Sequence, residues 1–361
     1  MSIHQLPQSR PAMSTFDNHP IDLNTLEQML SFARSDTDRT EWVTVLMAIK
    51  SEFGEAGKQA AREWSATAPN FKAADFNSTW KSIRTGGGIT IATLVKLAID
   101  NGFAFQPISA SEQARLKRMQ RQRRREQAKA NEAEAQTRAI QYQKAAQQAQ
   151  RLWGKAAPAP AFHPYLQRKQ VQPWGTRGIS TPGHADALVI PVVGTKPPFT
   201  GQVQSLQFIQ PDGQKRFLSG GKKAGGYYPI QWLDDAPVVI CEGFATGATL
   251  AEHYRPDHSV ICAFDSGNLE AVARYFRRQC PTTPMIVAGD NDHQTERQRG
   301  HNPGVHKAEK AALVVDAYLS IPAFGEDEAG TDWNDRWHLD QQRLEAMETE
   351  ALYNEFGGLG E

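Results

Sequence analysis

The sequence predicts an α+β protein of several domains, in which a small all-helical N-terminal domain and a long basic linker helix precede a core that ends in a mostly parallel sheet. Three observations support this. Apolar residues recur at helical spacing from Leu26 to Ile83, residues 111–153 contain neither Gly nor Pro, and the last third alternates short apolar runs with helical segments. A chain of 361 residues, with 40% hydrophobic and 22% charged residues, is long enough for two or three domains.

The helical domain is expected over residues 21–105, after a disordered N-terminus at residues 1–20. Three glycines, Gly86 to Gly88, interrupt the pattern before a last helix from Ile91 to Asn101. Lys81 and Arg84 beside these glycines are candidates for contact with DNA or a partner protein. The apolar positions are expected to form the core, and they are Leu26, Met29, Leu30, Phe32, Trp42, Val45, Leu46, Ile49, Trp64, Phe71, Phe76, Trp80 and Ile83.

A basic helical linker is expected over residues 106–161. Its uninterrupted part, residues 111–153, predicts one helix about 60 Å long at 1.5 Å per residue. From Arg115 to Arg125 it carries seven basic residues and no acid. A solvated linker helix is the simpler interpretation, and a strip that lies along a phosphate backbone is the alternative. No apolar heptad is sustained here, so the pattern does not favour a coiled coil.

Residues 162–235 are expected to form a strand-rich segment. Ala187–Val193 and Val203–Ile209 are apolar runs typical of paired strands. Glycines between Gly220 and Gly226 would let the backbone approach a ligand closely while the neighbouring lysines supply positive charge, although an ordinary hairpin loop has the same composition. The spacing of a P-loop is absent, so no helicase motor is indicated.

Acidic residues follow the apolar runs of the last third. Glu242 ends the run from Val238, and Asp290 and Asp292 follow the run from Met285 to Gly289. A further run, Val260 to Asp265, is expected as the strand between these two, and Ser320–Ala323 as a short fourth strand with Asp332 to Asp335 in the loop beyond it. Because the carboxyl ends of parallel strands meet at one edge of a sheet, these acids are expected to lie close together.

Several carboxylates at one place repel one another, and a bound cation makes such an arrangement tolerable. Oxygen ligands select hard ions, so the sequence predicts a site for Mg²⁺ or Mn²⁺, held by Glu242, Asp290, Asp292, Asp332 and Asp335. Unrelated turn carboxylates are the competing explanation. The three cysteines form no C-x-x-C pair, so zinc is not expected.

The order of these motifs, a strand followed by Glu242-Gly243, a strand followed by Asp290-x-Asp292, and a late Asp332-x-Asn334-Asp335, resembles the Toprim domain of bacterial primases, topoisomerases and some nucleases, over residues 236–340. The resemblance implies that Glu242, Asp290 and Asp292 are catalytic, with Glu242 as a general acid/base or metal contact. It also implies that Asp332 and Asp335 belong to the further acidic motif of the phage and plasmid primases. Residues 341–361 would form a C-terminal tail.

Two more segments carry a resemblance to primases. Trp42, the spacing Phe76-x-x-x-Trp80-x-x-Ile83 and the glycines before Thr90 resemble the primase C-terminal type 2 domain of phage and plasmid replication proteins. Residues 162–235 resemble the N-terminal half of the primase core. By that resemblance the basic residues expected to contact template or nucleoside triphosphates are Lys215, Arg216, Lys222 and Lys223, followed by Arg168, Lys169 and Arg177.

Together the resemblances imply a DNA primase of a phage, plasmid or integrative element, which makes short RNA primers on single-stranded DNA by two-metal nucleotidyl transfer. Its partners would be the single-stranded template, ribonucleoside triphosphates and a separate replicative helicase. A Toprim nuclease and a non-catalytic DNA-binding accessory protein remain alternatives. A net charge of zero hides a basic middle and an acidic C-terminal third. The chain is expected to be cytoplasmic, because it shows neither a membrane-spanning run nor a signal peptide.

Overall fold

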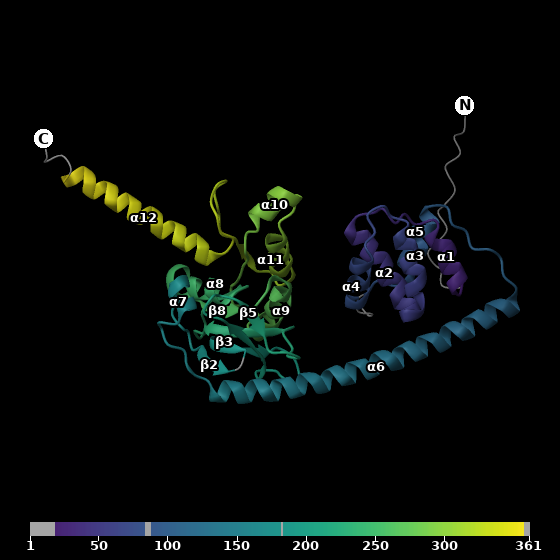
Figure 1. The fold of residues 1–361 in the computed structure, drawn as a ribbon, viewed down its shortest axis with the longest axis horizontal. Coiled ribbons are helices and arrows are strands. Elements are labelled where there is room, and N and C mark those ends of the chain that lie inside the picture. The colour runs from purple at the N-terminus through teal and green to yellow at the C-terminus, as the bar shows by residue number, and fades with distance from the viewer. Residues whose placement is uncertain (1–18, 84–87, 182, 357–361) are drawn as a thin grey trace, which may run out of the picture. The chain divides into compact units, whose positions relative to one another are not determined.

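The computed structural model describes residues 19–83, 88–181 and 183–356, and the chain forms two compact units, residues 1–136 and 137–361 (Figure 1). The expected disorder of residues 1–20 falls almost entirely on residues outside the described part, as do Arg84, Gly86 and Gly87. Among the described helices, none combines the length and the apolar character that a membrane span requires.

The first unit contains the predicted helices, and its all-helical character is confirmed. Asp22 and Asp38 cap the first two helices by accepting hydrogen bonds from the backbone N–H groups of Thr25 and Thr40, at 2.8 and 2.7 Å. Its helices are α1 (Leu23–Leu30), α2 (Arg39–Phe53), the 3₁₀ turn η2 (Gly54–Gly57), α3 (Lys58–Ala66), α4 (Ala73–Ser82) and α5 (Ile91–Asp100).

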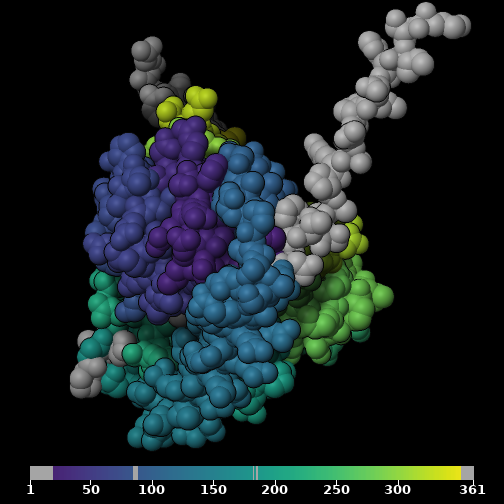
Figure 2. All heavy atoms as spheres, turned by 90° about the vertical axis from the view of Figure 1, so that its right-hand side faces the viewer, coloured from purple at the N-terminus to yellow at the C-terminus, as the bar shows by residue number. Residues whose placement is uncertain are grey.

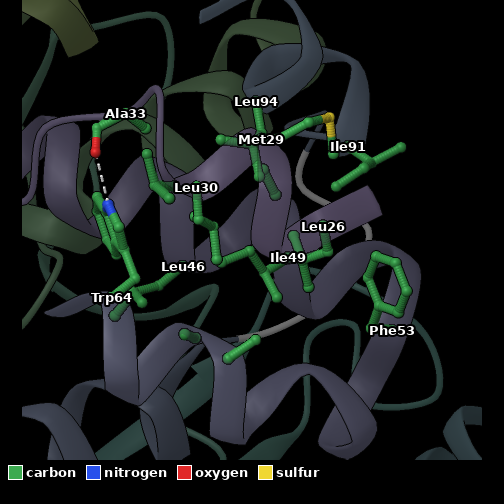
Figure 3. Close-up of a cluster of buried hydrophobic side chains, with 14 of the residues drawn as sticks. Leu26, Met29, Leu30, Ala33, Leu46, Ile49, Phe53, Trp64, Ile91 and Leu94 are labelled. Atoms are coloured by element: carbon green, nitrogen blue, oxygen red, sulfur yellow. Dashed lines mark hydrogen bonds between the residues drawn. The ribbon is translucent and has the colours of Figure 1, made fainter. Parts of the chain in front are cut away.

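The core of this unit consists of most of the apolar positions that the sequence places at helical spacing. Phe32 was expected there as well but is 40% exposed, and Trp42 and Phe71 are only half-buried at the edge of the core. Figure 3 shows Leu26 of α1 near Ile49 of α2 and Met29 of α1 beside Leu94 of α5, and all four side chains are fully buried. Trp64 closes one side of the core, where its indole Nε1 donates to the Ala33 carbonyl oxygen at 2.8 Å (Figure 3). These residues are structural.

The long helix is present as α6 (Ala110–Lys155), and each half of it packs on a different unit. In the first half, Arg123 and Arg124 form ion pairs with the buried Glu52 of α2 at 2.9 and 2.8 Å. Arg123 also donates to the Ile21 carbonyl oxygen at 3.2 Å. Figure 2 shows the atoms of the N-terminal helices in purple and dark blue. In the second half, Ala149 is buried against the strands of the second unit. Two of the seven basic residues between Arg115 and Arg125 therefore hold the helical unit together. For these two residues, neither a purely solvated helix nor a strip along a phosphate backbone is the right description.

A mixed sheet forms the centre of the second unit, with the strand order β1-β2-β3-β6-β8-β7-β9-β10, while β4 pairs with β3 and with β5. The predicted pairing of the two apolar runs is confirmed, because β3 and β4 are antiparallel neighbours. Its strands are β1 (Ala157–Pro158), β2 (Arg177–Thr181), β3 (His184–Gly194), β4 (Val203–Ile209), β5 (Lys215–Phe217), β6 (Gly226–Gln231), β7 (Val238–Cys241), β8 (Ser259–Cys262), β9 (Met285–Ala288) and β10 (Tyr318–Ser320).

The last four strands are parallel, as predicted, and helices cover both of their faces. Along β7, Val239 and Cys241 face the cluster that contains α8, whereas Val238 and Ile240 face the cluster that contains α9 and α11. The helices of this unit are α7 (Pro164–Lys169), α8 (Phe244–Thr249), the π-helix η3 (Leu250–Tyr254), the 3₁₀ turn η4 (Ser266–Asn268), α9 (Leu269–Gln279), α10 (His293–Arg299), α11 (Pro303–Val314) and α12 (Trp333–Phe356).

The structure corrects the sequence prediction near the C-terminus. The fourth parallel strand ends at Ser320, where the sequence placed its start. Asp335 lies in the first turn of α12 and not in a loop, because the Asp332 carboxylate accepts the Asp335 N–H at 2.8 Å and so starts the helix. The expected tail from residue 341 is part of this helix up to Phe356.

Candidate active site

The carboxyl ends of three neighbouring parallel strands are aligned and carry the acids of the site. Cys241, the last residue of β7, is in register with Cys262 of β8 on one side and with Ala288 of β9 on the other. Glu242 follows β7 directly, and Asp290 comes two residues after the end of β9. The sheet therefore brings together acids that are about fifty residues apart in the chain, as the strand pattern predicts.

These acids open onto a cavity of about 430 Å³ within the second unit. Acidic and basic side chains share its wall. Glu242, Asp290 and Asp332 come from the predicted acidic set, and Lys215, Arg168 and Lys169 come from the predicted basic set. The other lining residues are Tyr165, Asp212, Gly213, Gly243, Ala245, Thr246, Phe264, Asp265 and Ser266.

Glu242 and Asp290 are partly buried, and the neighbouring groups compensate for this burial only in part. Burial raises the pKa of Glu242 to about 7, opposed by a hydrogen bond from the Asp290 backbone and reinforced by the charge of Asp292. Burial, followed by the charge of Glu242, raises the pKa of Asp290 to about 8. Glu242 Oε1 and Asp290 Oδ1 are buried and lack a hydrogen-bond partner in the described part of the chain. Lys215 is one of the cations that reduce this effect, because its charge lowers the pKa of Asp290.

Asp265 is an additional acid of this cavity that the sequence argument did not select. The chain leaves β8 through Phe264, which has a φ of 71°, an unusual backbone conformation for a large side chain. Asn268 holds this turn by donating to the Ala263 and Gly226 carbonyl oxygens at 2.8 and 2.7 Å. The Asp265 carboxylate is then paired with Lys223 at 2.8 Å. The sequence signal that could have identified Asp265 is its position at the end of the apolar run from Val260. Asp265 is part of that predicted strand in the sequence and is not among the predicted site residues.

Asp292 and Asp335 are not among the residues that line the cavity, and their carboxylates make other contacts. Asp292 Oδ2 accepts the N–H of Gly304 at 3.0 Å, at the start of α11. Asp335 Oδ2 accepts the Thr331 N–H at 3.0 Å, and its Oδ1 lies 3.3 Å from Lys169 Nζ. The structure thus gives these two acids a structural role, and the metal contact expected of them stays a prediction.

The other basic candidates lie in different surroundings. Arg177 packs over the Trp153 ring at 4.3 Å and donates to the Trp153 carbonyl oxygen at 2.6 Å, so it fixes the end of α6. Burial lowers the pKa of Lys222, with a further effect of Lys196. Arg216 is exposed on β5, and like Arg177 and Lys222 it does not line the cavity in the described structure. Arg168 donates to the Pro211 carbonyl oxygen at 3.0 Å, which holds α7 beside the cavity.

Asn334 is fully buried and anchors the start of α12. Its Nδ2 donates to the Lys169 carbonyl oxygen at 2.7 Å and to Thr249 Oγ1 at 2.8 Å. The sequence suggested that Asn334 orients a carboxylate or a bound water, whereas the observed contacts tie α12 to α7 and α8. It therefore helps to fix α7, whose Lys169 lines the cavity.

Two protein families match the two units. Residues 237–341 match the Toprim domain family, and residues 26–98 match the family described as primase C terminal 2. The chain therefore contains a segment similar to the Toprim domain and a segment similar to the primase C terminal 2 domain. Both matches agree with the resemblances found in the sequence, and the acids described above lie inside the Toprim match.

Among curated proteins, the chain is similar to two DNA primases named TraC from Escherichia coli. One is 39% identical over 206 residues, which are 55% of this chain and 14% of the relative. The other is 35% identical over 200 residues, which are 54% of this chain and 18% of the relative. The chain thus spans less than a fifth of the length of these relatives.

Among solved structures, the primase fragment of the bacteriophage T7 primase-helicase protein overlays with a TM-score of 0.35 at 15% identity, over 54% of this chain and 75% of that one. The primase domains of two gp4 subunits, bound to an RNA/DNA hybrid and dTTP together with the T7 lagging-strand DNA polymerase, give a TM-score of 0.33 over 54% and 93% of the two chains. Overlays of this size add nothing to the assignment.

The carboxylate oxygens of the Toprim segment are the type of ligand that a hard divalent cation prefers. As the structure describes them, these acids are nevertheless not close enough to one another to form a complete set of metal ligands. Among the described residues, no group of three or more His, Cys, Asp and Glu side chains is close enough to form a metal site. The observation in favour is the pair of buried, unpartnered oxygens on Glu242 and Asp290 in a cavity wall. A cation bound there would supply the charge that these oxygens lack.

Proposed function

We propose that this protein is a DNA primase, which joins ribonucleotides into short RNA primers on single-stranded DNA. One observation carries the proposal: a single cavity combines the incompletely compensated acids Glu242 and Asp290 with the cations Lys215 and Arg168. A nucleoside triphosphate needs both kinds of group, cations for its phosphates and oxygen ligands for the divalent ion that it carries. The two curated relatives are named as DNA primases, which supports the same activity.

In the proposed reaction, the 3′-hydroxyl oxygen of the growing primer forms a bond to the α-phosphorus of the incoming nucleotide, and the bond from that phosphorus to pyrophosphate breaks. Glu242 would act either as a ligand of the divalent ion or as the acceptor of the hydroxyl proton. Lys215 and Arg168 would hold the triphosphate and stabilise the departing pyrophosphate.

Glu242 and Asp290 would hold Mg²⁺ or Mn²⁺, with Asp332 and Asp265 as neighbours in the same wall. Bound in this way, two ions would lower the pKa of the attacking hydroxyl and neutralise the charge of the leaving group. Asp265 is ready for this role only when Lys223 releases its carboxylate, because the two are paired at 2.8 Å.

The partners belong to the same proposal. They are a single-stranded DNA template, ribonucleoside triphosphates and a separate helicase, in the cytoplasm of a cell that carries a plasmid, phage or integrative element. The matches to the primase C terminal 2 family and to relatives named DNA primase TraC support the template and the nucleotides among these partners.

A Toprim nuclease is the second candidate, since a similar set of acids in the same cavity could act on a phosphodiester bond. The two activities differ in their need for nucleotides. Cleavage needs only a water molecule as nucleophile, whereas primer synthesis also needs nucleoside triphosphates. The shared wall of cations favours synthesis, because the triphosphate brings more negative charge into the cavity than a single phosphodiester does.

The test is incubation of the protein with single-stranded DNA, labelled ribonucleotides and Mg²⁺, with products and template separated on a sequencing gel. We expect short labelled products from the wild-type protein and from Asp327→Asn, an exposed acid of the same unit. Asp290→Asn should make about 100-fold fewer products or none. A cut template without synthesis would identify a nuclease, and synthesis at the wild-type level in Asp290→Asn would remove this site from the reaction.

A further inference from the structure

We propose that the helical unit carries a second nucleic-acid site, separate from the catalytic cavity, which binds one unpaired nucleotide of a single strand. The site is a cavity of about 160 Å³ between the loop that precedes α2 and the loop that joins α3 to α4. Its wall combines two aromatic rings with two cations, Trp42 and Phe71 with Arg39 and Lys72. The remaining lining residues are Ser35, Thr37, Ser65, Ala68, Asn70 and Asp75.

The aromatic part of this cavity is held in a fixed orientation. Trp42 Nε1 donates to Ser65 Oγ at 3.0 Å, and Ser65 Oγ donates to the Ala61 carbonyl oxygen at 2.8 Å. Trp42 and Phe71 both pack against the core of the unit but stay half-buried. By contrast, Trp64 and Trp80 of the same unit are only 6% and 2% exposed and serve the core. Trp42 is therefore the tryptophan of this unit that offers part of its ring to a ligand.

The charged part of the wall is positive. Arg39 and Lys72 are exposed, and neither forms an ion pair with an acid among the described residues. Asp75 is the carboxylate that lines the same cavity, so two cations face one anion. Cations without ion-pair partners at the rim of an aromatic hollow attract a ligand that has both a flat apolar ring and a negative charge.

A nucleotide of a single strand has this combination, a base that stacks on an aromatic ring and phosphates that bind cations. The volume suits a base and leaves the sugar and phosphates at the rim, beside Arg39 and Lys72. Asn70 lines the cavity and could meet the edge of the base, without a requirement for one base type. The hydroxyl groups of Ser35 and Thr37 line it too, but they already form hydrogen bonds with Thr67 Oγ1 and with the Asp38 carbonyl oxygen. The site would hold the template strand independently of the catalytic acids.

The test uses the full chain, a fluorescent oligodeoxythymidine and no nucleotides or metal, so its result does not depend on primer synthesis. The double variant Arg39→Gln/Lys72→Gln should bind about tenfold more weakly at low salt, and the salt dependence of binding should fall by about 1.4, for two lost phosphate contacts at about 0.7 each. A matched control is Arg62→Gln/Lys96→Gln, two exposed cations of the same unit that lie outside the cavity, which should bind as the wild type does.

A second measurement reports on the base. Binding of the oligonucleotide should quench tryptophan emission, and Trp42→Phe, which keeps an aromatic ring in place, should lose most of this quenching while it retains most of the affinity. Unchanged affinity and salt dependence in Arg39→Gln/Lys72→Gln would overturn the proposal. Quenching that persists in Trp42→Phe would also overturn it, because the base would then stack elsewhere.

Discussion

The two units treat a buried carboxylate in opposite ways. In the helical unit, Glu52 is 5% exposed, and Arg123 and Arg124 each place a guanidinium nitrogen within 3 Å of it, at 2.9 and 2.8 Å. In the second unit, Glu242 and Asp290 are partly buried near each other, and each has a buried oxygen without a hydrogen-bond partner among the described residues. The first arrangement neutralises the carboxylate charge with side chains of the same unit. The second leaves part of the carboxylate charge to be neutralised by a bound cation or substrate.

The difference separates an acid with a structural role from the acids that the proposed function uses, without reference to any family. Burying a carboxylate costs free energy unless a partner offsets the loss of water, and Glu52 has two such partners. Glu242 and Asp290 keep this cost, which raises their pKa values to about 7 and about 8. Acids keep such an unfavourable free energy of burial at sites where a bound cation or substrate later offsets it.

The largest expected effect is on activity. Asp290→Asn keeps the shape of the side chain and removes its charge, so primer synthesis should fall by about 100-fold or more. A quantitative primer-extension assay at several Mg²⁺ concentrations checks this. If high Mg²⁺ fully restored the rate of the variant, Asp290 would contribute only to the affinity for the metal. An unchanged rate would mean that Asp290 is not part of the active site.

The next effect concerns the stability of the helical unit. Glu52→Gln leaves two arginines without their partner, and because Arg124 is 60% exposed the cost should be about 1–3 kcal/mol and not more. Urea unfolding followed by tryptophan fluorescence measures it. Glu27→Gln, an exposed acid on α1, is the matched control and should unfold as the wild type does. Equal stability of the two variants would mean that the ion pairs do not hold α6 on this unit.

A smaller effect is the pH dependence of the metal-free protein. Glu242 and Asp290 have pKa values of about 7 and about 8 in the fold, against ordinary values near 4 in an unfolded chain. Between about pH 4 and pH 8 the folded state therefore binds more protons, so its stability should fall as the pH rises through this range and level off above it. Thermal unfolding in chelator across these pH values checks the sign, and stability that rises from pH 6 to pH 8 would contradict it.

The smallest effect is expected for the exposed pair at the cavity. Lys223 and Asp265 are 44% and 35% exposed, so Lys223→Ala should change the stability by less than about 1 kcal/mol. It would leave Asp265 as one more carboxylate without a partner at the cavity. Isothermal titration with Mn²⁺ should then show tighter binding than in the wild type, and weaker binding would indicate that Lys223 itself helps to assemble the site.

The sequence reveals most of the fold because its signals are local. Apolar periodicity gives the helices of the first unit, and the ends of apolar runs give Glu242 and Asp290 their place at the sheet edge. Contacts between distant segments are the part that it does not reveal. Asp290 and Asp292 look alike in the sequence, but the structure shows that Asp292 Oδ2 accepts a hydrogen bond from the N–H of Gly304. Glu52 looks like a surface acid until α6, some 70 residues later, covers it.

The same limit explains Asp265 and Asn334. Asp265 joins the cavity because the backbone turns through an unusual conformation at Phe264, which no residue pattern announces. Asn334 reads as part of an acidic motif, and its burial against Thr249 and the Lys169 carbonyl oxygen depends on the packing of three helices.

The most direct test of the account is thermal unfolding of the wild type and of Asp290→Asn at pH 8, each in chelator and in Mg²⁺. We predict that in chelator the variant melts at a higher temperature than the wild type, because it lacks one incompletely compensated charge, and that Mg²⁺ raises the melting temperature of the wild type alone. A variant that melts lower in chelator and gains as much from Mg²⁺ as the wild type would show that these buried acids are not a metal site.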